Sequence, residues 1–137
     1  MIDAPFDFSA CRQCACSAVR RASRAITQHY DAALRGSGLR NTQFTLLATL
    51  AQGGPMPMTR LAAFLGLERT TLTRNLKALL RDGLVEQREE KDGRVRRIAV
   101  TAKGEMAARK AFPLWKKAQD SVREVTASFD LGLASGG

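Results

Sequence analysis

The stretch from residue 58 to residue 101 constrains the fold most strongly, because its hydrophobic periodicity changes from helical to strand-like within it. The pattern predicts a first helix over residues 60–65, with Thr59 as its N-cap and Gly66 at its end. A short turn leads from Gly66 into a second helix, and a short turn containing glycine allows two helices to cross steeply. The stretch therefore predicts a helix-turn-helix unit.

The second helix, predicted over residues 68–82, has one apolar and one basic face. Its leucines recur at helical spacing within an arc of roughly 100°. The opposite face carries hydrogen-bond donors and no acid, namely Thr70, Thr71, Arg74, Lys77 and Arg81. A basic helix is often only a solvated surface, but such a surface usually mixes both charge signs. Small hydroxyls beside long cations suit a nucleic-acid groove, where Thr approaches a phosphate or a thymine methyl and Arg binds guanine.

A hairpin is predicted after Gly83, which should end the second helix. Strand-like runs over residues 84–90 and 94–100 flank an Asp-Gly pair, which is a strong hairpin signal. Residues 88–97 hold five cations and three acids, and an Arg near the hairpin tip is well placed for a narrow A·T-rich minor groove. A charged hairpin can instead serve only to prevent edge-to-edge aggregation. Beside the basic helix, we prefer a wing that contacts DNA.

Several segments match one known family pattern. Residues 61–76, followed by Asp82-Gly83-Leu84-Val85 and by Asp92-Gly93-Arg94, resemble the MarR family of bacterial regulators. The resemblance extends over nearly the whole chain and includes Gln43-Phe44 and Thr101-Ala102-Lys103-Gly104. The Asp-x-Arg element is its most specific single part.

The resemblance to the MarR family implies a mostly α fold with a small β-hairpin wing, that is, a winged helix-turn-helix whose terminal helices form a dimerisation domain. The homodimer would bind a near-palindromic operator in double-stranded DNA, with the 68–82 helix in the major groove and Arg94 in the minor groove. Many members release DNA on binding a small aromatic ligand or on cysteine oxidation, so a small-molecule inducer is a further expected partner. The expected DNA-binding residues are Arg69, Thr70, Thr71, Thr73, Arg74, Lys77, Arg94 and Arg96.

Both ends of the chain are predicted to be helical. Residues 9–34 predict one helix of about 39 Å at 1.5 Å per residue, more than a small domain can cover on its own. After residue 101 an apolar seam recurs at alternating spacings of four and three, which is typical of a helix packed along another helix. Its members are Ala111, Trp115, Ala118, Val122, Val125 and Phe129. Pro113 must kink this helix or begin a new one.

These terminal helices suggest how the chain is organised. We expect residues 1–40 and 102–137 to build a dimerisation domain around a DNA-binding region at residues 41–101. The alternative is that the terminal helices fold back onto their own domain. Within the central region, residues 41–51 predict a helix whose inward side chains are Phe44, Leu47, Ala48 and Ala51, and a short strand is expected at Met56 near the hairpin.

Three cysteines lie close to the N-terminus. Cys11 and Cys14 form a CxxC pair and Cys16 follows, but the chain has no second CxxC and only one His, so no zinc site is expected. If Ser9 is the N-cap of the first helix, the helix dipole and Arg12 would lower the pKa of Cys11 and favour its thiolate. Some MarR-like peroxide sensors carry a reactive cysteine in a similar place. The preferred interpretation is nevertheless that these are small buried or interface cysteines without a redox role.

His29, Tyr30 and Trp115 are candidate walls of a ligand pocket. They lie on the apolar faces of the terminal helices. Most histidines in such a position are packed and hydrogen-bonded, and this is the preferred interpretation. The alternative places all three beside a ligand between the dimerisation and DNA-binding parts.

Composition and motifs exclude several classes of function. A net charge of +9 indicates a polyanionic partner without implying sequence specificity. The sequence shows no phosphate-binding loop, HExxH or GxSxG, so we predict no enzyme, metal or cofactor. No apolar run reaches 18 residues and no basic leader precedes one, so a cytoplasmic protein is expected. The leading prediction is a sequence-specific regulator, preferably a repressor; the alternative is a sequence-indifferent architectural or RNA-binding protein.

Overall fold

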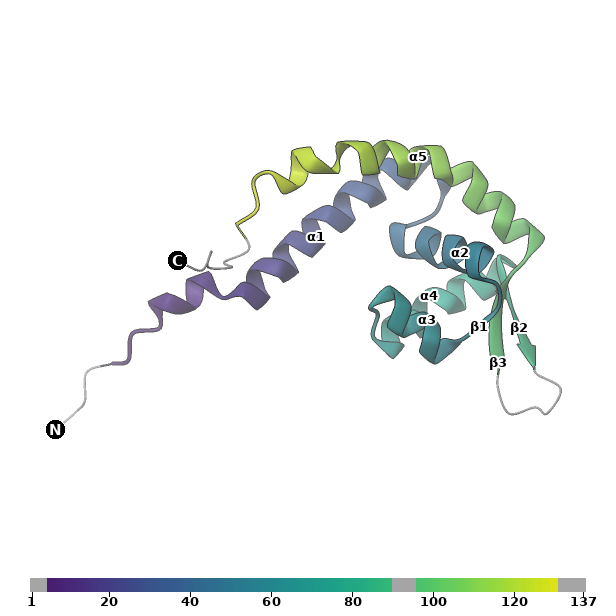
Figure 1. Cartoon of the computed structure of the whole chain (residues 1–137), viewed down its shortest axis with the longest axis horizontal. Coiled ribbons are helices and arrows are strands. Elements are labelled where there is room, and N and C mark those ends of the chain that lie inside the picture. Colours follow the sequence, from purple (N-terminus) through teal and green to yellow (C-terminus); the bar gives the residue numbers. More distant parts are fainter. Residues whose placement is uncertain (1–4, 90–95, 131–137) are drawn as a thin grey trace.

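The chain forms a compact lobe and a two-helix stalk (Figure 1). The structure, a computed structural model, describes residues 5–89 and 96–130. The helices are α1 (Ala15–Leu34), α2 (Asn41–Gly53), α3 (Met58–Leu65), α4 (Arg69–Arg81) and α5 (Ala102–Thr126), with short 3-10 helices η1 (Ser9–Gln13) and η2 (Arg35–Ser37). The strands are β1 (Met56–Pro57), β2 (Val85–Glu89) and β3 (Arg96–Val100). We call residues 41–100 the lobe and the pair α1 and α5 the stalk.

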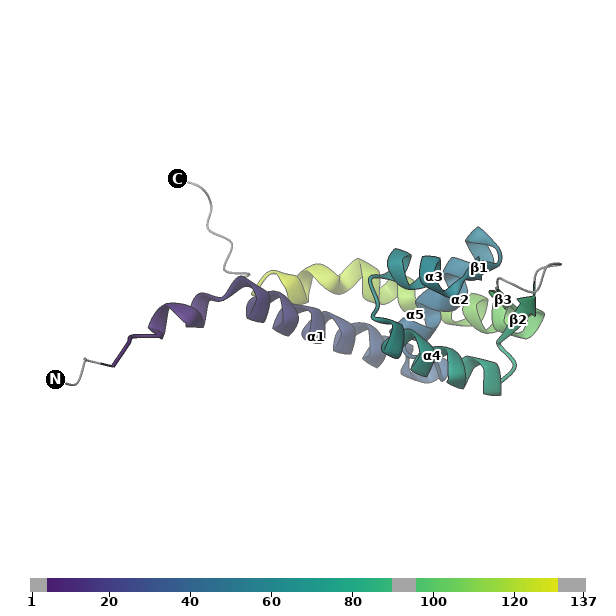
Figure 2. The same cartoon turned by 90° about the horizontal axis from the view of Figure 1, so that it is seen from below.

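The stalk helices run antiparallel and extend away from the lobe, as two perpendicular views show (Figure 1, Figure 2). Small side chains line their contact, because the buried residues of the pair include Ala18, Ala22 and Ala118. The apolar seam predicted after residue 101 thus packs against α1 of the same chain. Pro113 lies inside α5 and does not begin a new helix. It removes one backbone donor, and α5 follows a curved path over the lobe (Figure 1).

The prediction of a single helix over residues 9–34 is wrong. The backbone leaves helical geometry at Cys14, whose ψ is 116°, so that η1 precedes the break and α1 follows it. None of the residues in η1 is buried. Most helical stability in proteins comes from packing an apolar face, and residues 9–13 have no such packing within the chain. The first long helix is therefore only 20 residues.

The helix-turn-helix is confirmed, with one shifted boundary. The N-cap of α3 is Pro57 and not Thr59, because the strand β1 runs directly into the helix. Gly66 ends α3 with a φ of 65°, and Gly83 follows α4 with a φ of 72°. At the second site, the amide of Leu84 donates to the carbonyl of Leu79 at 2.9 Å. This 6→1 bond closes the helix end only because a glycine adopts the left-handed conformation.

Leucines from α3 and α4 form the centre of the lobe, as predicted. Leu61, Leu72 and Leu79 are at most 1% exposed, and fully burying one such side chain is worth about 1.5–3 kcal/mol. The inward face predicted for α2 is only partly correct, because Leu46 and Leu50 are buried while Ala51 is exposed. The cause is that α2 packs against α5 on one side and against α4 and β3 on the other.

The strands form an antiparallel sheet in the order β1-β3-β2. Met56 pairs with Ile98, which confirms the short strand expected there, and Arg88 pairs with Arg97 in the hairpin. The predicted hairpin tip, including Asp92-Gly93 and Arg94, lies outside the described residues. In the part of the chain that the structure describes, no helix is both long and apolar enough to cross a membrane.

Candidate nucleic-acid interface

The outer face of α4 carries most of the predicted contact residues. Burial of its leucine stripe in the lobe turns the opposite side to solvent, and α4 runs along one edge of the lobe (Figure 2). Thr71 is half-buried and the other predicted α4 residues are exposed: Arg69, Thr70, Thr73, Arg74 and Lys77. The structure thus brings six of the eight predicted DNA-binding residues onto one helix.

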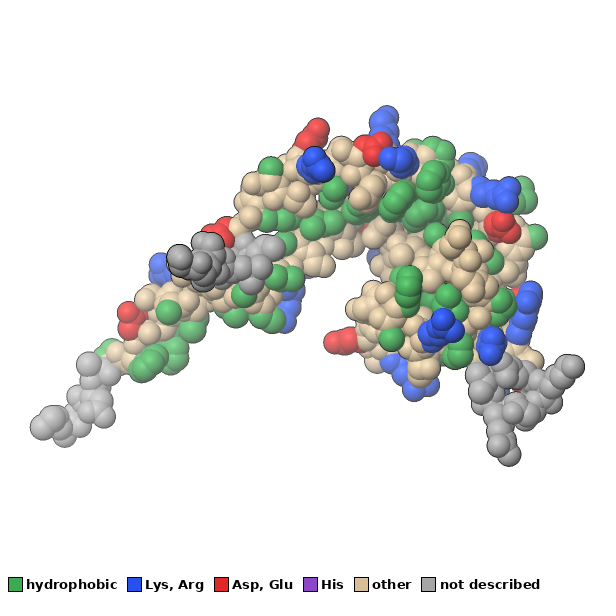
Figure 3. All heavy atoms as spheres, in the orientation of Figure 1, with side chains coloured by type: hydrophobic (Ala, Val, Ile, Leu, Met, Phe, Trp, Pro, Cys, Tyr) green, Lys and Arg blue, Asp and Glu red, His purple; other side chains and the backbone are tan. Residues whose placement is uncertain are grey.

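Charge on this face is not neutralised nearby. Among the described residues, no carboxylate lies within 4.0 Å of the side-chain nitrogens of Arg69, Arg74 or Lys77. Arg81, one turn further along, differs because it pairs with Asp82 at 3.3 Å. Basic side chains gather along the lower and outer edges of the lobe (Figure 3). Solvent-exposed cations without intramolecular acids remain available to a polyanion.

Hydrogen bonds within α4 distinguish Thr73, whose hydroxyl is bonded to the helix backbone, from Thr70. The hydroxyl of Thr73 donates to the carbonyl of Arg69 at 2.8 Å, which commits its only proton to the helix. The Asn75 amide similarly donates to the carbonyl of Thr71 at 2.9 Å. Thr73 therefore presents mainly its methyl group and an oxygen acceptor. Thr70, in the first turn of the helix, is exposed.

The base of the wing carries cations that are partly paired. Arg96 lies 4.0 Å from Glu89, with both side chains 69% exposed, and Arg88 contacts Glu86 at 2.9 Å. Such exposed pairs are weak and exchange easily with phosphate. Arg96 is thus accessible but less free than Arg74. The predicted minor-groove residue Arg94 is not among the described residues.

A contact that the sequence analysis missed fixes the far end of α4. The hydroxyl of Thr101 accepts from the Gly104 amide at 3.0 Å and donates to the Gly83 carbonyl at 2.7 Å. The ammonium of Lys103 donates to the Asp82 carbonyl at 2.9 Å. Thr101, Lys103 and Gly104, which we call the α5 clamp, join the start of α5 to the end of α4. The sequence signal for this contact is a Thr-x-x-Gly that follows a strand, because Thr is a favoured N-cap and so predicts that a helix starts there.

The α5 clamp also requires glycine. A Cβ on Gly104 would lie 1.9 Å from the carbonyl oxygen of Leu84 and 2.9 Å from Val100 Cγ2. The amide of Thr101 donates to that same Leu84 oxygen at 3.1 Å. The start of α5 therefore sits directly on the backbone that follows α4.

All three cysteines are exposed. The structure places Cys14, and not Cys11, at the start of a long helix. Cys11 lies in η1 and not at the second position of a long helix, whereas Cys14 is the N-cap of α1. The amide of Ser17, then its hydroxyl and the amide of Cys16, stabilise the Cys14 thiolate and lower the pKa of Cys14. The described residues contain no group of three His, Cys, Asp or Glu side chains arranged to hold a metal.

His29, Tyr30 and Trp115 come together, but as packing between α1 and α5. His29 Nε2 lies 3.0 Å from the Ala118 carbonyl oxygen, and the Tyr30 hydroxyl donates to Gln119. The rings of Tyr30 and Trp115 are stacked at 6.4 Å, and burial raises the pKa of Tyr30. This arrangement agrees with the preferred interpretation of a packed histidine.

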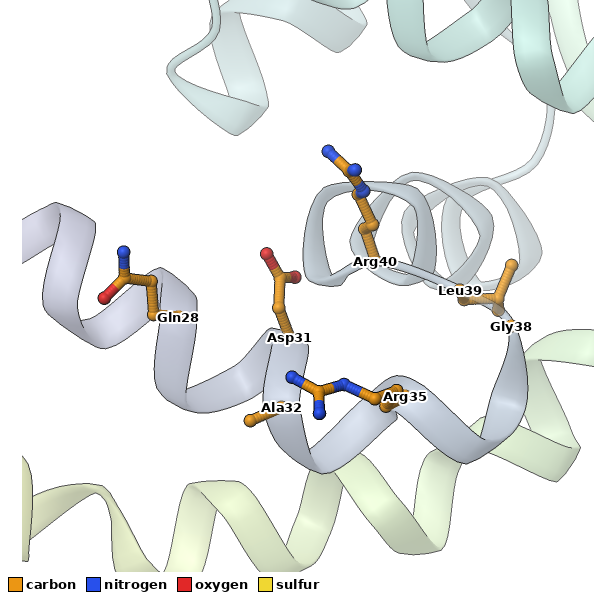
Figure 4. Close-up of a pocket in the computed structure, with 7 residues that line it drawn as sticks. All are labelled: Gln28, Asp31, Ala32, Arg35, Gly38, Leu39 and Arg40. Atoms are coloured by element: carbon orange, nitrogen blue, oxygen red, sulfur yellow. The ribbon is translucent and has the colours of Figure 1, made fainter.

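A separate hollow lies at the junction of α1, η2 and α2 (Figure 4). It measures about 680 Å³, and Arg35, Asp31 and Arg40 are its charged lining residues. Asp31 is engaged in structure, because its carboxylate accepts from the Asn41 amide at 2.7 Å at the start of α2. The hollow contains none of the three predicted pocket residues.

Comparisons with known proteins place the chain in a family. A sequence model of the MarR family matches residues 37–95. The chain is 53% identical to the transcriptional regulator MosR of M. tuberculosis in a complex with DNA, over 84% of this chain and 82% of that chain, with a TM-score of 0.71. It is 25% identical to reduced AbfR bound to DNA, over 77% and 79% of the two chains, with a TM-score of 0.66.

A further relative is also named as a helix-turn-helix transcriptional regulator. The chain is 29% identical over 87 residues to an uncharacterized HTH-type transcriptional regulator, YwoH, of Bacillus subtilis, and spans 64% of the length of YwoH. The winged lobe, the match to the family sequence model and the likeness to MosR agree with one another. The chain belongs to the MarR family.

Proposed function

We propose that this protein is a cytoplasmic, sequence-specific transcriptional regulator that binds double-stranded DNA as a homodimer and represses the genes next to its operator. One observation carries the proposal, namely the exposed basic face of α4, from Arg69 to Lys77, where no described carboxylate lies within 4.0 Å of an Arg or Lys nitrogen. The DNA complexes of the relatives MosR and AbfR support it.

The proposal gives different roles to the residues of α4. Arg74 and Thr70 read base edges in the major groove, since a guanidinium binds guanine in a bidentate manner and a Thr methyl can contact thymine. Lys77 contacts a phosphate, which adds affinity without sequence information. Thr71, Thr73 and Arg69 border the groove. In the wing, Arg94 enters the minor groove and Arg96 contacts the backbone beside it.

Single substitutions on α4 test these roles. Arg74→Ala should weaken binding to a selected operator by about 1–3 kcal/mol and relax sequence preference, as loss of a base contact does. Lys77→Ala should weaken binding to all duplexes alike and flatten the salt dependence by about one unit of slope. Lys110, which is exposed on α5, gives the matched control Lys110→Ala. Equal losses on operator and random duplex for Arg74→Ala would contradict its role in base recognition.

Dimerisation follows from the geometry of operators. Two half-sites lie about 34 Å apart along one turn of DNA, so two copies of α4 are needed to read both. The stalk carries the apolar surface that we propose for this contact, together with both described ends of the chain. Residues 1–40 and 102–137 then form the dimerisation part, and residues 41–101 the DNA-binding part.

We further propose that cysteine oxidation releases the DNA. Three exposed thiols lie within six residues, and the lowered pKa of Cys14 increases its thiolate fraction. Peroxide would oxidise a thiolate to the sulfenic acid, and a second thiol would condense with it to a disulfide and water. Overoxidized AbfR, like reduced AbfR, is bound to DNA, so the form that we propose to release DNA is the disulfide and not an overoxidized thiol. The packed state of His29, Tyr30 and Trp115 gives less support to a small-ligand inducer.

A peroxide titration, with DNA affinity as the measured quantity, tests whether cysteine oxidation controls DNA binding. Peroxide should lower the affinity for DNA, and replacing the reacting Cys11, Cys14 or Cys16 with Ser should remove the effect. Unchanged affinity after oxidation verified by mass spectrometry would contradict the proposal of redox control while leaving DNA binding intact.

A further inference from the structure

The residues before α1 include two phenylalanines whose side chains are mostly exposed in their own chain. Phe6 is 78% exposed and Phe8 is 68% exposed. Their rings contact each other at a centroid distance of 4.9 Å, so they form one apolar knob. We call residues 5–13 the leading segment. Two adjacent exposed aromatic side chains on a projecting segment are typical of a protein contact.

The stalk offers an apolar groove at the same end of the molecule. A hollow of about 380 Å³ lies between α1 and the end of α5, and its apolar lining comes from Val19, Ala22, Ile26 and Phe129. Val19 is 47% exposed although it lies on the apolar face of α1. The groove is continuous with the seam in which Ala22 and Ala118 are buried.

The leading segment of the same chain does not enter this groove. The backbone turns at Cys14, and the segment then continues beyond the end of α1 and away from α5 in both perpendicular views (Figure 1, Figure 2). Its described hydrogen bonds are local, such as those between Ser9 and Asp7. Among the described residues, the groove is thus left open to another chain.

The geometry points to a second copy of this chain as that partner. We propose that Phe6 and Phe8 of one copy dock into the stalk groove of the other, and that the exchange is reciprocal. A two-fold dimer requires such a self-complementary contact, in which each copy supplies both knob and groove. The inference rests on the homodimer of the proposed function and names the segment that holds the dimer together.

The expected area is a substantial part of a dimer interface. An aromatic side chain buries about 150–250 Å², so four phenylalanines in a reciprocal exchange bury roughly 600–1,000 Å². A stable interface buries about 1,600 Å² in total. The exchanged segments would thus supply much of the contact, and direct packing of the two stalks would supply the remainder.

Photo-crosslinking in mixed dimers tests the docking directly. The photoreactive p-benzoylphenylalanine replaces Phe8 in an unlabelled full-length chain, which is mixed with an isotope-labelled chain that carries no crosslinker. We expect crosslinked peptides that join residue 8 of the unlabelled chain to residues 19–26 or 126–129 of the labelled chain. The same crosslinker at Phe64, which is 71% exposed on the lobe, is the control and should not reach the groove.

A double substitution gives an independent readout. Phe6→Ala with Phe8→Ala should raise the dimer dissociation constant at least tenfold in sedimentation experiments, while Phe64→Ala should leave it unchanged. The far-ultraviolet circular dichroism spectrum of the double variant should match that of the wild type, because both side chains are mostly exposed within their own chain.

The outcomes separate this inference from the proposed function. A dimer without crosslinks, with crosslinks only inside one chain, or with crosslinks outside the groove would overturn the docking and leave the dimer intact. A wild-type protein that sediments as a monomer would overturn both.

Discussion

Replacing Gly104 with alanine should destabilise the protein, although alanine is the better helix former. The helix propensity of alanine favours the substitution by about 1 kcal/mol. Against this, the new Cβ would lie 1.9 Å from the Leu84 carbonyl oxygen, which is backbone and cannot move as a side chain rotamer does. Overpacking of this kind costs about 1–3 kcal/mol. Displacement of the α5 clamp also weakens the bond from Thr101 to Gly83, worth about 0.5–1.5 kcal/mol.

The net expectation for Gly104→Ala is a loss of about 1–3 kcal/mol in the free energy of unfolding, since the steric and hydrogen-bond terms exceed the gain in propensity. For a chain of this size, the melting temperature should fall by roughly 4–12 °C. Thermal unfolding followed by circular dichroism at fixed protein concentration measures it. Gly36→Ala is the matched control, because a Cβ on Gly36 meets no atom within 4 Å. If Gly104→Ala melts at or above the temperature of Gly36→Ala, the close contact of α5 with Leu84 is refuted.

Two further predictions concern ionisation. In a Cys11→Ser/Cys16→Ser variant, alkylation of the remaining Cys14 should show a midpoint below pH 9.0, the ordinary pKa of a thiol, and a midpoint at or above it would be inconsistent with stabilisation by the start of α1. Burial raises the pKa of Tyr30 above its ordinary value of 10.0, so the folded state keeps its proton where the unfolded state loses it. Stability should therefore decline as the pH rises above 10.0, and the decline should be smaller in Tyr30→Phe; tyrosinate absorbance reports on Tyr30 alone, because it is the only tyrosine.

The helix-turn-helix could be predicted because its signals are local. Leucine spacing in α4 and the glycines at positions 66 and 83 act within one or two turns of backbone, and both glycines have positive φ. The short strand at Met56 could be placed because the hairpin that it joins was also evident. In these segments the local preferences and the tertiary contacts agree.

Features that depend on distant partners were missed. The break at Cys14 arises because residues 9–13 have nothing to pack against in their own chain, which helical periodicity cannot reveal. Burial of Leu46 and Leu50 depends on α2 lying between α5 and the rest of the lobe. The α5 clamp joins Lys103 to Asp82 across 21 residues of sequence. Each of these follows from the arrangement of elements and not from any one element.

In the candidate site, too, the features set by local sequence could be predicted and those set by distant contacts could not. Residues of one helix, from Arg69 to Lys77, could be assigned to one face from sequence alone, and the structure presents them together. The environment of the cysteines could not be derived, because the identity of the N-cap decided which thiol the helix dipole would affect. His29, Tyr30 and Trp115 could be placed near one another, but their packing required the geometry of the stalk.

A binding titration of the reduced protein tests sequence-specific DNA recognition most directly. The two probes are the DNA upstream of its own gene and a scrambled duplex of equal length, each at several salt concentrations. The proposed function predicts a preference of about 10³-fold or more for the upstream DNA, in the range of specific regulators. Equal affinity for both duplexes with a steep salt dependence would contradict sequence-specific regulation at that site and would favour a general nucleic-acid binder.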